Sequence, residues 1–295
     1  MRRLTAVSLL LLAACGATTA QAQSLSLTYK SGDTYKYTIH STANETIDAG
    51  VMTVPFKLDL TALETVKVNS VDSSGAADLS IDLSNVVVKS TTDQAMNTGP
   101  RKPLPTISMK VAADGHILSV NGSSLGGSPF TKFTGMGGGF ISAVLPNTAV
   151  KPGDTWSKDF DQPDPVGTGT MHVTTTSKYL RDESLQAIKA AVIETTSKAS
   201  VDVTIDMSSA IAAAGSGATL PMLPNGVLQS MTIKGTMTSV VTSWVDPSGH
   251  RVMKSHKTGS TNATTTLNLA PGATIPGMSG PITIKGDETT DLSPA

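Results

Sequence analysis

Hydrophobic and polar residues alternate along most of the chain after residue 23. In residues 34–40 (TYKYTIH) the alternation places Tyr35, Tyr37 and Ile39 on one face, and residues 54–60 (VPFKLDL) repeat the pattern. A period of two is that of a β-strand with one buried face, because successive side chains point to opposite sides of a sheet. The pattern therefore predicts strands for most of the protein.

Short turn sequences separate several of these predicted strands. Residues 64–71 and 77–89 are joined by a glycine-containing link, and Asp114-Gly115 interrupts the alternation of residues 106–120. Glycine accepts a positive φ at little cost, and Asp-Gly is a strong hairpin signal. Both places predict antiparallel hairpins.

The second half of the chain repeats features of the first half in the same order. SGDTY at residues 31–35 returns as PGDTW at residues 152–156, and the hairpin sequence of residues 109–120 returns at residues 242–255. Turn sequences draw on few residue types, so each pair alone is weak. Two pairs in one order indicate an internal duplication.

One segment fits two interpretations. Residues 181–198 space Leu185, Ile188 and Val192 as on one face of a helix, with Asp182 in the position of a helix cap. The duplication, however, aligns this segment with residues 72–85, which have the pattern of a strand, and its flanks are rich in β-branched residues. We expect a strand, a turn and a strand here, with an amphipathic helix as the alternative.

Three segments break the alternation and combine glycine and proline with apolar residues: 122–146, 207–228 and 269–284. Exposed loops are usually polar, so apolar loops are expected to fold over something. They either cap the sheet or line an apolar cavity, where methionine side chains adapt to varied ligands.

The expected fold is all-β, with an antiparallel, twisted sheet or sheets from two similar halves and few short helices. The halves are residues 23–145 and 146–285, and residues 286–295 are predicted to be a flexible polar tail. A half-barrel and a sandwich of two sheets satisfy the pattern equally well, whereas a closed barrel is less favoured.

The start of the chain has the features of an export signal. Two arginines precede residues 4–12, an apolar stretch too short for a permanent membrane span. Cleavage at small residues predicts a signal peptide of residues 1–22, and lipidation at Cys15 predicts one of residues 1–14. Cys15 is the only cysteine, so no disulfide explains it. We expect an exported protein that is periplasmic, anchored to the outer membrane as a lipoprotein, or secreted.

The composition narrows the classes of function. Charged residues make up 15% of the chain and the net charge is −1, where a soluble chain usually has about 25% charged residues. Nucleic-acid binding is not indicated, because the chain lacks a basic stripe with interleaved aromatic residues. The glycine-rich stretch at residues 135–139 lacks the Lys-Ser/Thr of a phosphate loop, so no cofactor is expected.

Motifs that could carry catalysis or bind a metal are weak. GSSLG at residues 122–126 matches the G-x-S-x-G pattern of serine hydrolases around Ser124, but that turn must lead directly into a helix, and GSPFTKF follows instead. The histidines never stand two or four residues apart, which is the spacing of a local metal clamp. We expect no catalytic residue and no metal site.

Two motifs carry a resemblance to known proteins. YKSGDTYKY at residues 29–37 and PNTAVKPGDTW at residues 146–156 match the patterns Y-x-x-G-D-x-Y-x-Y and P-x-x-x-V-K-x-G-D-x-W. In these the chain resembles a poorly characterised group of secreted or lipid-anchored bacterial β-proteins, which implies export but no assigned activity. More loosely, it is similar to periplasmic carriers of lipoproteins, whose curved half-barrel holds acyl chains on its concave face.

The expected function is that of a non-catalytic bacterial envelope protein that binds an apolar ligand, such as a hydrophobic small molecule or lipid, or an envelope component. The candidate ligand-binding residues are Tyr35, Tyr37, Phe56, Phe130, Phe133, Met136, Phe140 and Trp156. The alternative is a structural protein that contacts a partner envelope protein through its sheet edges or loops. An enzyme with a site built from remote residues ranks third. Membrane contact is expected only through a lipid anchor on Cys15.

Overall fold

The computed structural model describes residues 21–50, 52–91, 106–121, 142–163, 170–206, 227–274 and 280–295. These residues form one antiparallel sheet of 11 strands, and none of them lies in a helix. In chain order the strands are β1 (Thr34–Asp48), β2 (Thr53–Val71), β3 (Ala77–Ser90), β4 (Ile107–Val111), β5 (Ile117–Asn121), β6 (Thr155–Pro163), β7 (Thr170–Leu185), β8 (Ile188–Asp206), β9 (Leu228–Asp246), β10 (Arg251–Leu269) and β11 (Ile282–Pro294). The predicted all-β class is confirmed.

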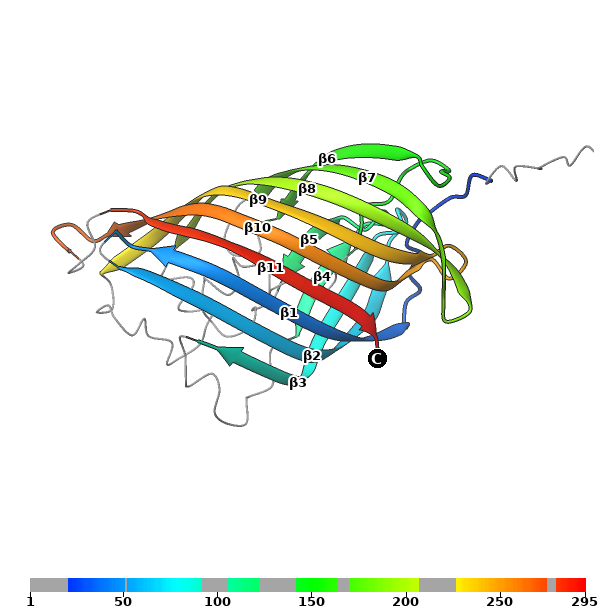
Figure 1. Ribbon diagram of the computed structural model, residues 1–295, viewed down its shortest axis with the longest axis horizontal. Helices are drawn as coiled ribbons and strands as arrows, with labels where there is room; N and C mark the ends of the chain where they lie inside the picture. The colour runs from blue at the N-terminus through cyan, green and yellow to red at the C-terminus, as the bar shows by residue number, and fades with distance from the viewer. Residues whose placement is uncertain are drawn as a thin grey trace, which may run out of the picture.

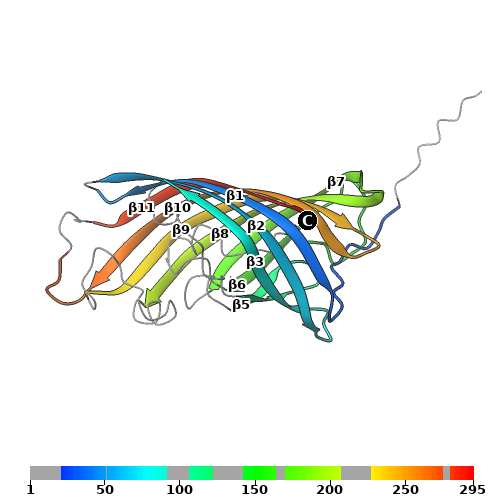
Figure 2. The same ribbon diagram turned by 90° about the horizontal axis from the view of Figure 1, so that it is seen from below.

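Each strand pairs with the next one along the chain, except at the step from β5 to β6. The sheet order is β5-β4-β3-β2-β1-β11-β10-β9-β8-β7-β6, so the first and last strands of the chain pair in its middle. The sheet curls until its edge strands β5 and β6 lie against each other without a hydrogen-bonded ladder (Figures 1 and 2). The half-barrel therefore describes the structure better than the sandwich of two sheets does, because a single sheet curls until it almost closes on itself.

Residues 286–295 do not form the flexible tail that the sequence predicted. Residues 282–294 form β11, which pairs with β1 on one side and β10 on the other. The inward positions of this strand include Gly286, Glu288 and Thr290. Polar residues at buried positions hide the alternation, which is why the segment looks like a polar tail in the sequence.

The predicted hairpins are confirmed, including the ambiguous one. β7 ends at Leu185 and β8 begins at Ile188, and the two residues between them, Gln186 and Ala187, have φ angles of 49° and 66°. Positive φ at both central residues gives a type I′ turn, whose twist matches that of the flanking strands. Tertiary pairing therefore overrides the helical spacing in this segment.

The two Gly-Asp-Thr motifs have the same local structure. Gly32 and the following aspartate pair through their backbones with Val68, and Gly153 and its aspartate pair in the same way with Tyr179, at 2.8 to 3.0 Å. Both glycines adopt positive φ, 92° and 98°, which favours glycine. Each motif opens a run of five strands, β1–β5 and β6–β10, and β11 follows the second run. The residue limits of the two halves stay a prediction.

The N-terminal segment, residues 23–29, crosses one end of the curled sheet. The Leu27 N–H donates to the Ala113 carbonyl oxygen in the β4–β5 turn at 2.7 Å, and the Thr28 N–H donates to the His250 carbonyl oxygen in the β9–β10 turn at 2.9 Å. The segment thereby joins two turns that lie far apart in the sheet order and caps this end.

Candidate functional site

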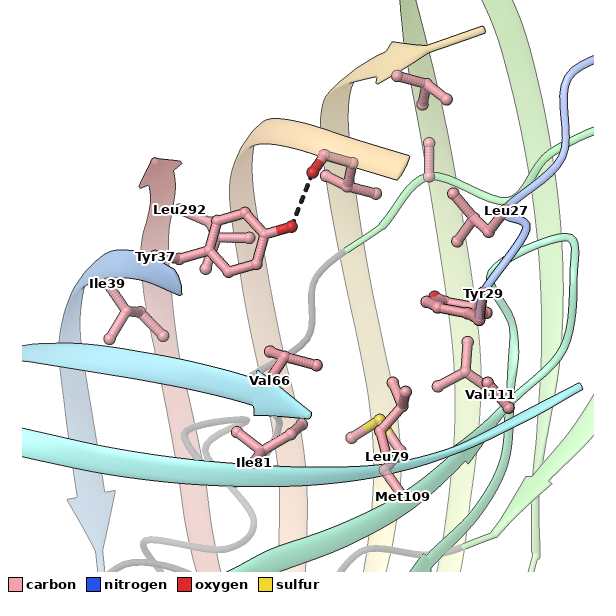
Figure 3. Packing of buried hydrophobic residues seen from close by; sticks show 14 of the residues in the cluster. Leu27, Tyr29, Tyr37, Ile39, Val66, Leu79, Ile81, Met109, Val111 and Leu292 are labelled. Atoms are coloured by element: carbon pink, nitrogen blue, oxygen red, sulfur yellow. Dashed lines mark hydrogen bonds between the residues drawn. The ribbon is translucent and has the colours of Figure 1, made fainter. Parts of the chain in front are cut away.

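The concave face of the sheet carries a large apolar cluster near the capped end, which we call the core cluster. Leu27 and Tyr29 of the N-terminal segment pack here against side chains that point inward from β1, β2, β3, β4 and β11 (Figure 3). Tyr37 lies among them and donates from Oη to the Val252 carbonyl oxygen at 2.8 Å. The protein's own side chains fill this end of the sheet.

A second apolar cluster lies further along the strands on the same face. It joins two groups that share contacts with Leu267. Its buried members are Ala49, Met171, Val173, Val201, Val203, Ile205, Met231, Ile233, Ala263, Ile282 and Ile284. They come from the neighbouring strands β7 to β11 and from the end of β1, and none belongs to the N-terminal segment. The second cluster is therefore an apolar face on one side of the sheet, and these side chains are buried.

Polar side chains separate the two clusters. The strand registers align two adjacent rows on the concave face, running from β7 across β8, β9, β10 and β11 to β1. We call the polar members of these rows the polar belt: Ser41, Thr175, Ser177, Thr195, Ser197, Ser239, Lys257, Glu288 and Thr290. Along the strands from the capped end, the concave face therefore carries the core cluster, then the polar belt and then the second cluster.

A segment of the chain, residues 142–150, covers the β7–β9 side of this face. The Val144 N–H donates to Thr195 Oγ1 at 3.1 Å, and Ser177 Oγ donates to the Val144 carbonyl oxygen at 3.0 Å. The Ala143 N–H donates to Ser243 Oγ at 2.8 Å. These buried hydroxyls satisfy the backbone of a segment that is not in the sheet, as buried polar groups require.

The β10–β11–β1 side of the polar belt carries charged groups. Lys257 Nζ lies 2.5 Å from Glu288 Oε1, and both side chains are largely buried. Glu45 points inward beside them and is only 9% exposed. Burial, together with the neighbouring Glu288 carboxylate, raises the pKa of Glu45 to about 7.

Two glycines make room for these carboxylates. A Cβ atom on Gly286 would lie 2.5 Å from Glu45 Cγ, and one on Gly259 would lie 2.7 Å from Glu288 Oε1. Gly286 is the direct partner of Glu45 across β1–β11, and Gly259 is that of Glu288 across β10–β11. The carboxylate side chains therefore lie over glycine backbone on the concave face.

Glu64 is a third inward carboxylate, and it lies apart from the polar belt. It pairs with Tyr37 across β1–β2, is fully buried, and neither of its carboxylate oxygens has a hydrogen-bond partner in the structure. Burial raises its pKa to about 8. An uncompensated charge here is costly, so Glu64 is protonated in the folded protein below that pH.

The boundary between β5 and β6, which we call the seam, is joined by side chains. Lys158 Nζ on β6 lies 2.5 Å from Asp114 Oδ2 in the β4–β5 turn, and it also donates to Asn147 Oδ1 at 2.7 Å. The rings of His116 and Phe160 are in contact, with centroids 4.9 Å apart. Asp114 also bonds the His116 ring nitrogen Nδ1.

The four predicted ligand-binding residues that the structure describes lie in or against the core cluster and not in the second cluster. Tyr37 belongs to the core cluster, and Tyr35, Phe56 and Trp156 pack against it. Trp156 Nε1 donates to the Val144 carbonyl oxygen at 2.9 Å, which ties it to residues 142–150. The remaining candidates, and the lipidation candidate, lie outside the described residues: Phe130, Phe133, Met136, Phe140 and Cys15.

The charged residues of the concave face escaped the sequence analysis. Glu45, Glu64 and Glu288 each occupy an inward position of an alternating strand. A carboxylate at a position that the alternation assigns to the buried face indicates a functional residue, because ionised groups are rarely buried without a partner. In a chain rich in threonine and serine, however, the sequence does not show clearly which positions face inward.

Of the comparisons with known proteins, the one with solved structures gives matches. Neither a scan against models of protein families nor a search of curated proteins matches the sequence. Among solved structures the chain is similar to lipovitellin, in a study of lipid–protein interactions in that protein, with 10% identity and a TM-score of 0.40. The match covers 90% of this chain and 26% of the other, so the chain spans about a quarter of the length of that structure.

Two features are absent from the part of the chain that the structure describes. No helix among the described residues is long and apolar enough to cross a membrane. No group of three or more histidine, cysteine, aspartate or glutamate side chains among them is arranged to hold a metal ion.

Proposed function

We propose that this protein is a non-catalytic binding protein that holds an apolar ligand, such as an acyl chain, on the concave face of its sheet. The observation that carries the proposal is the second cluster. Its buried side chains come from adjacent strands of one side of the sheet, whereas the core cluster is filled from several sides and by the N-terminal segment. An apolar surface of this kind on a concave face is suited to an extended chain.

The energetics of such binding favour a long ligand. Each methylene removed from water contributes about 0.8 kcal/mol, and association costs several kcal/mol in lost freedom of motion. A chain of about fifteen carbons is therefore the shortest that we expect to bind with micromolar affinity, because about 12 kcal/mol of burial is needed to offset the association cost.

The hydroxyls of the concave face support binding over catalysis. Ser177, Thr195 and Ser243 each hydrogen-bond the backbone of residues 143–144. A nucleophilic hydroxyl needs a general base beside it, and these side chains hold a segment of the chain instead. We therefore propose that the polar belt is structural on its β7–β9 side.

Binding of dodecanol, measured by displacement of a hydrophobic fluorescent dye, tests the proposal. For this twelve-carbon chain we expect a dissociation constant on the order of 0.1 mM. We expect a loss of about tenfold for Val203→Thr, which places a hydroxyl in the second cluster at constant shape. Thr204→Ser, on the opposite face of the same strand, is the control and leaves the affinity unchanged. Native mass spectra that show no bound lipid, together with no dye binding, would overturn the proposal.

The export signal in the sequence supports a location in the bacterial envelope. We propose that the protein is exported and anchored through a lipid on Cys15, with a soluble periplasmic or secreted form as the alternative. Acyl chains on Cys15 add about 0.8 kcal/mol of membrane affinity for each buried methylene. The intact mass of the native protein tests this, and an N-terminus at Gln23 without added lipid contradicts the anchored form.

A further inference from the structure

We propose that Glu45, Glu288 and Lys257 form a head-group site for an amphipathic ligand that carries a primary ammonium group. This inference rests on the proposed function and assigns the chemistry of the ligand's polar end. The ligand's apolar chain lies on the second cluster, and its ammonium group lies at the polar belt against the Glu45 carboxylate.

The first observation is that Glu45 is buried without a partner. It is 9% exposed and points to the concave face of β1. The hydrogen bonds and ion pairs of the described residues include none to Glu45, and its carboxylate oxygens, unlike those of Glu64, are not fully closed off from solvent. A carboxylate removed from water is unfavourable unless a cation or hydrogen-bond donors compensate it. Glu45 therefore lacks a cation or hydrogen-bond donor within the protein, and a ligand can supply one.

The second observation is the balance of charge around Glu45. Lys257 on β10 is paired with Glu288 on β11, so the one nearby cation among the described residues is already neutralised. The residue opposite Glu45 on β2 is Phe56, and the nearest inward side chains of β9 are Met237 and Ser239, none of which is charged. Two carboxylates, Glu45 and Glu288, therefore face one ammonium group. One further cation neutralises the remaining negative charge.

The third observation is that the site adjoins the apolar surface. Ile47 follows Glu45 by two residues and points to the same face, and it pairs with Ile284, which pairs in turn with Ala263. Ile284 and Ala263 belong to the second cluster. A straight chain lying along this surface can therefore end at Glu45 without leaving the concave face.

A primary ammonium group fits these observations best. It carries a positive charge and three N–H donors, and charge-assisted hydrogen bonds to carboxylates are about twice as strong as neutral ones. Glu45 and Glu288 both offer acceptor oxygens, whereas an anionic head would face two carboxylates. Burial and Glu288 keep the pKa of Glu45 near 7, so an ammonium group also favours its ionised form.

The test compares single-chain amphiphiles that differ only at the head: dodecylamine, dodecanol and dodecanoate. Dye displacement at pH 8 gives the affinity of each for the full chain, for Glu45→Gln and for Glu194→Gln. Glu194 lies on the outward face of β8, so its variant removes the same charge from the other side. Glu45→Gln keeps the side-chain shape and removes a like-charge repulsion, so it is expected to fold.

We expect the wild-type protein to bind dodecylamine at least about tenfold more tightly than dodecanol, and dodecanoate more weakly than either. Glu45→Gln loses the preference for the amine and keeps the affinity for dodecanol, while Glu194→Gln changes neither. Equal binding of amine and alcohol, or a preference that survives in Glu45→Gln, overturns the head-group site and leaves apolar binding intact. Binding of none of the three overturns the proposed function itself.

Discussion

Lys158 Nζ and Asp114 Oδ2 lie 2.5 Å apart across the seam, where the sheet stops short of closing. β5 and β6 form no ladder, so this largely buried ion pair joins the two edges in place of backbone hydrogen bonds. Burial acts to raise the pKa of Asp114, but hydrogen bonds from His116 and Lys158 outweigh it, so the pKa lies well below its usual range. The pair therefore stabilises the seam while Asp114 is ionised.

Replacing Asp114 by asparagine weakens the seam. Removing one partner leaves the Lys158 ammonium buried without its counter-charge, so we expect a loss of about 2 kcal/mol in the free energy of unfolding. Hydrogen exchange of β5 and β6 should accelerate more than that of β10. Because the folded-state pKa is lowered, the contribution is present above about pH 4 and fades as the pH falls further.

Asp202→Asn is the control for the seam. Asp202 pairs with Lys234 at 3.0 Å on the outward face, where both side chains are about two-thirds exposed. Exposed pairs contribute little, so we expect no measurable change in stability. Equal effects of the two substitutions would show that the seam has no special role.

Glu64 makes the protein less stable as the pH rises. The carboxyl ionises near pH 4.5 when unfolded but near pH 8 when folded, so the unfolded state loses its proton first and the free energy of unfolding falls across this range. The full loss is at most about 5 kcal/mol. Denaturant titrations at pH 5 and pH 8.5 measure it.

Glu64→Met removes this pH dependence. The methionine side chain has similar length and no charge, so we expect the variant to be more stable than the wild type at pH 8.5 by about 2 kcal/mol or more. Glu194→Gln, on the outward face of β8, keeps the wild-type slope. An unchanged slope in Glu64→Met would show that another group causes the fall.

Gly286→Ala is expected to disturb the pairing of β1 with β11. Its Cβ would lie 2.6 Å from the Asn44 carbonyl oxygen and 2.8 Å from Glu45 Cα, and these backbone atoms cannot move without shifting β1. We expect a loss of about 1–3 kcal/mol in thermal or denaturant unfolding. Gly280→Ala, where a Cβ meets nothing within 4 Å, is the matched control and should be close to neutral.

Ser243→Ala tests how residues 142–150 are held on the concave face. The substitution removes the acceptor of the Ala143 N–H, whose hydrogen bond is buried, so we expect a loss of about 1–2 kcal/mol and faster proteolysis near residue 142. Ser239→Ala, at an inward position of the same strand, should have a smaller effect. Equal protection from proteolysis in both variants contradicts this role for Ser243.

The sequence by itself determined the strands and the neighbours within hairpins. Alternation identifies β1 and β2, and local turn chemistry at Asp114-Gly115 and at the two Gly-Asp-Thr motifs sets where strands begin and end. These signals involve residues close in the chain, so they can be interpreted without knowing the rest of the fold. Tyr37 and Trp156 stand out in the sequence as candidate ligand-binding residues, and the structure places both in the packing of the core cluster.

Only the tertiary structure decided what lies inside the curled sheet. The pairing of β1 with β11, the approach of β5 to β6 and the cap formed by Leu27 and Thr28 depend on the accumulated twist of all 11 strands, which no local pattern encodes. The same holds for the charged site. Glu45, Lys257 and Glu288 belong to three strands, and the pairing of β11 with β1 on one side and β10 on the other brings them together.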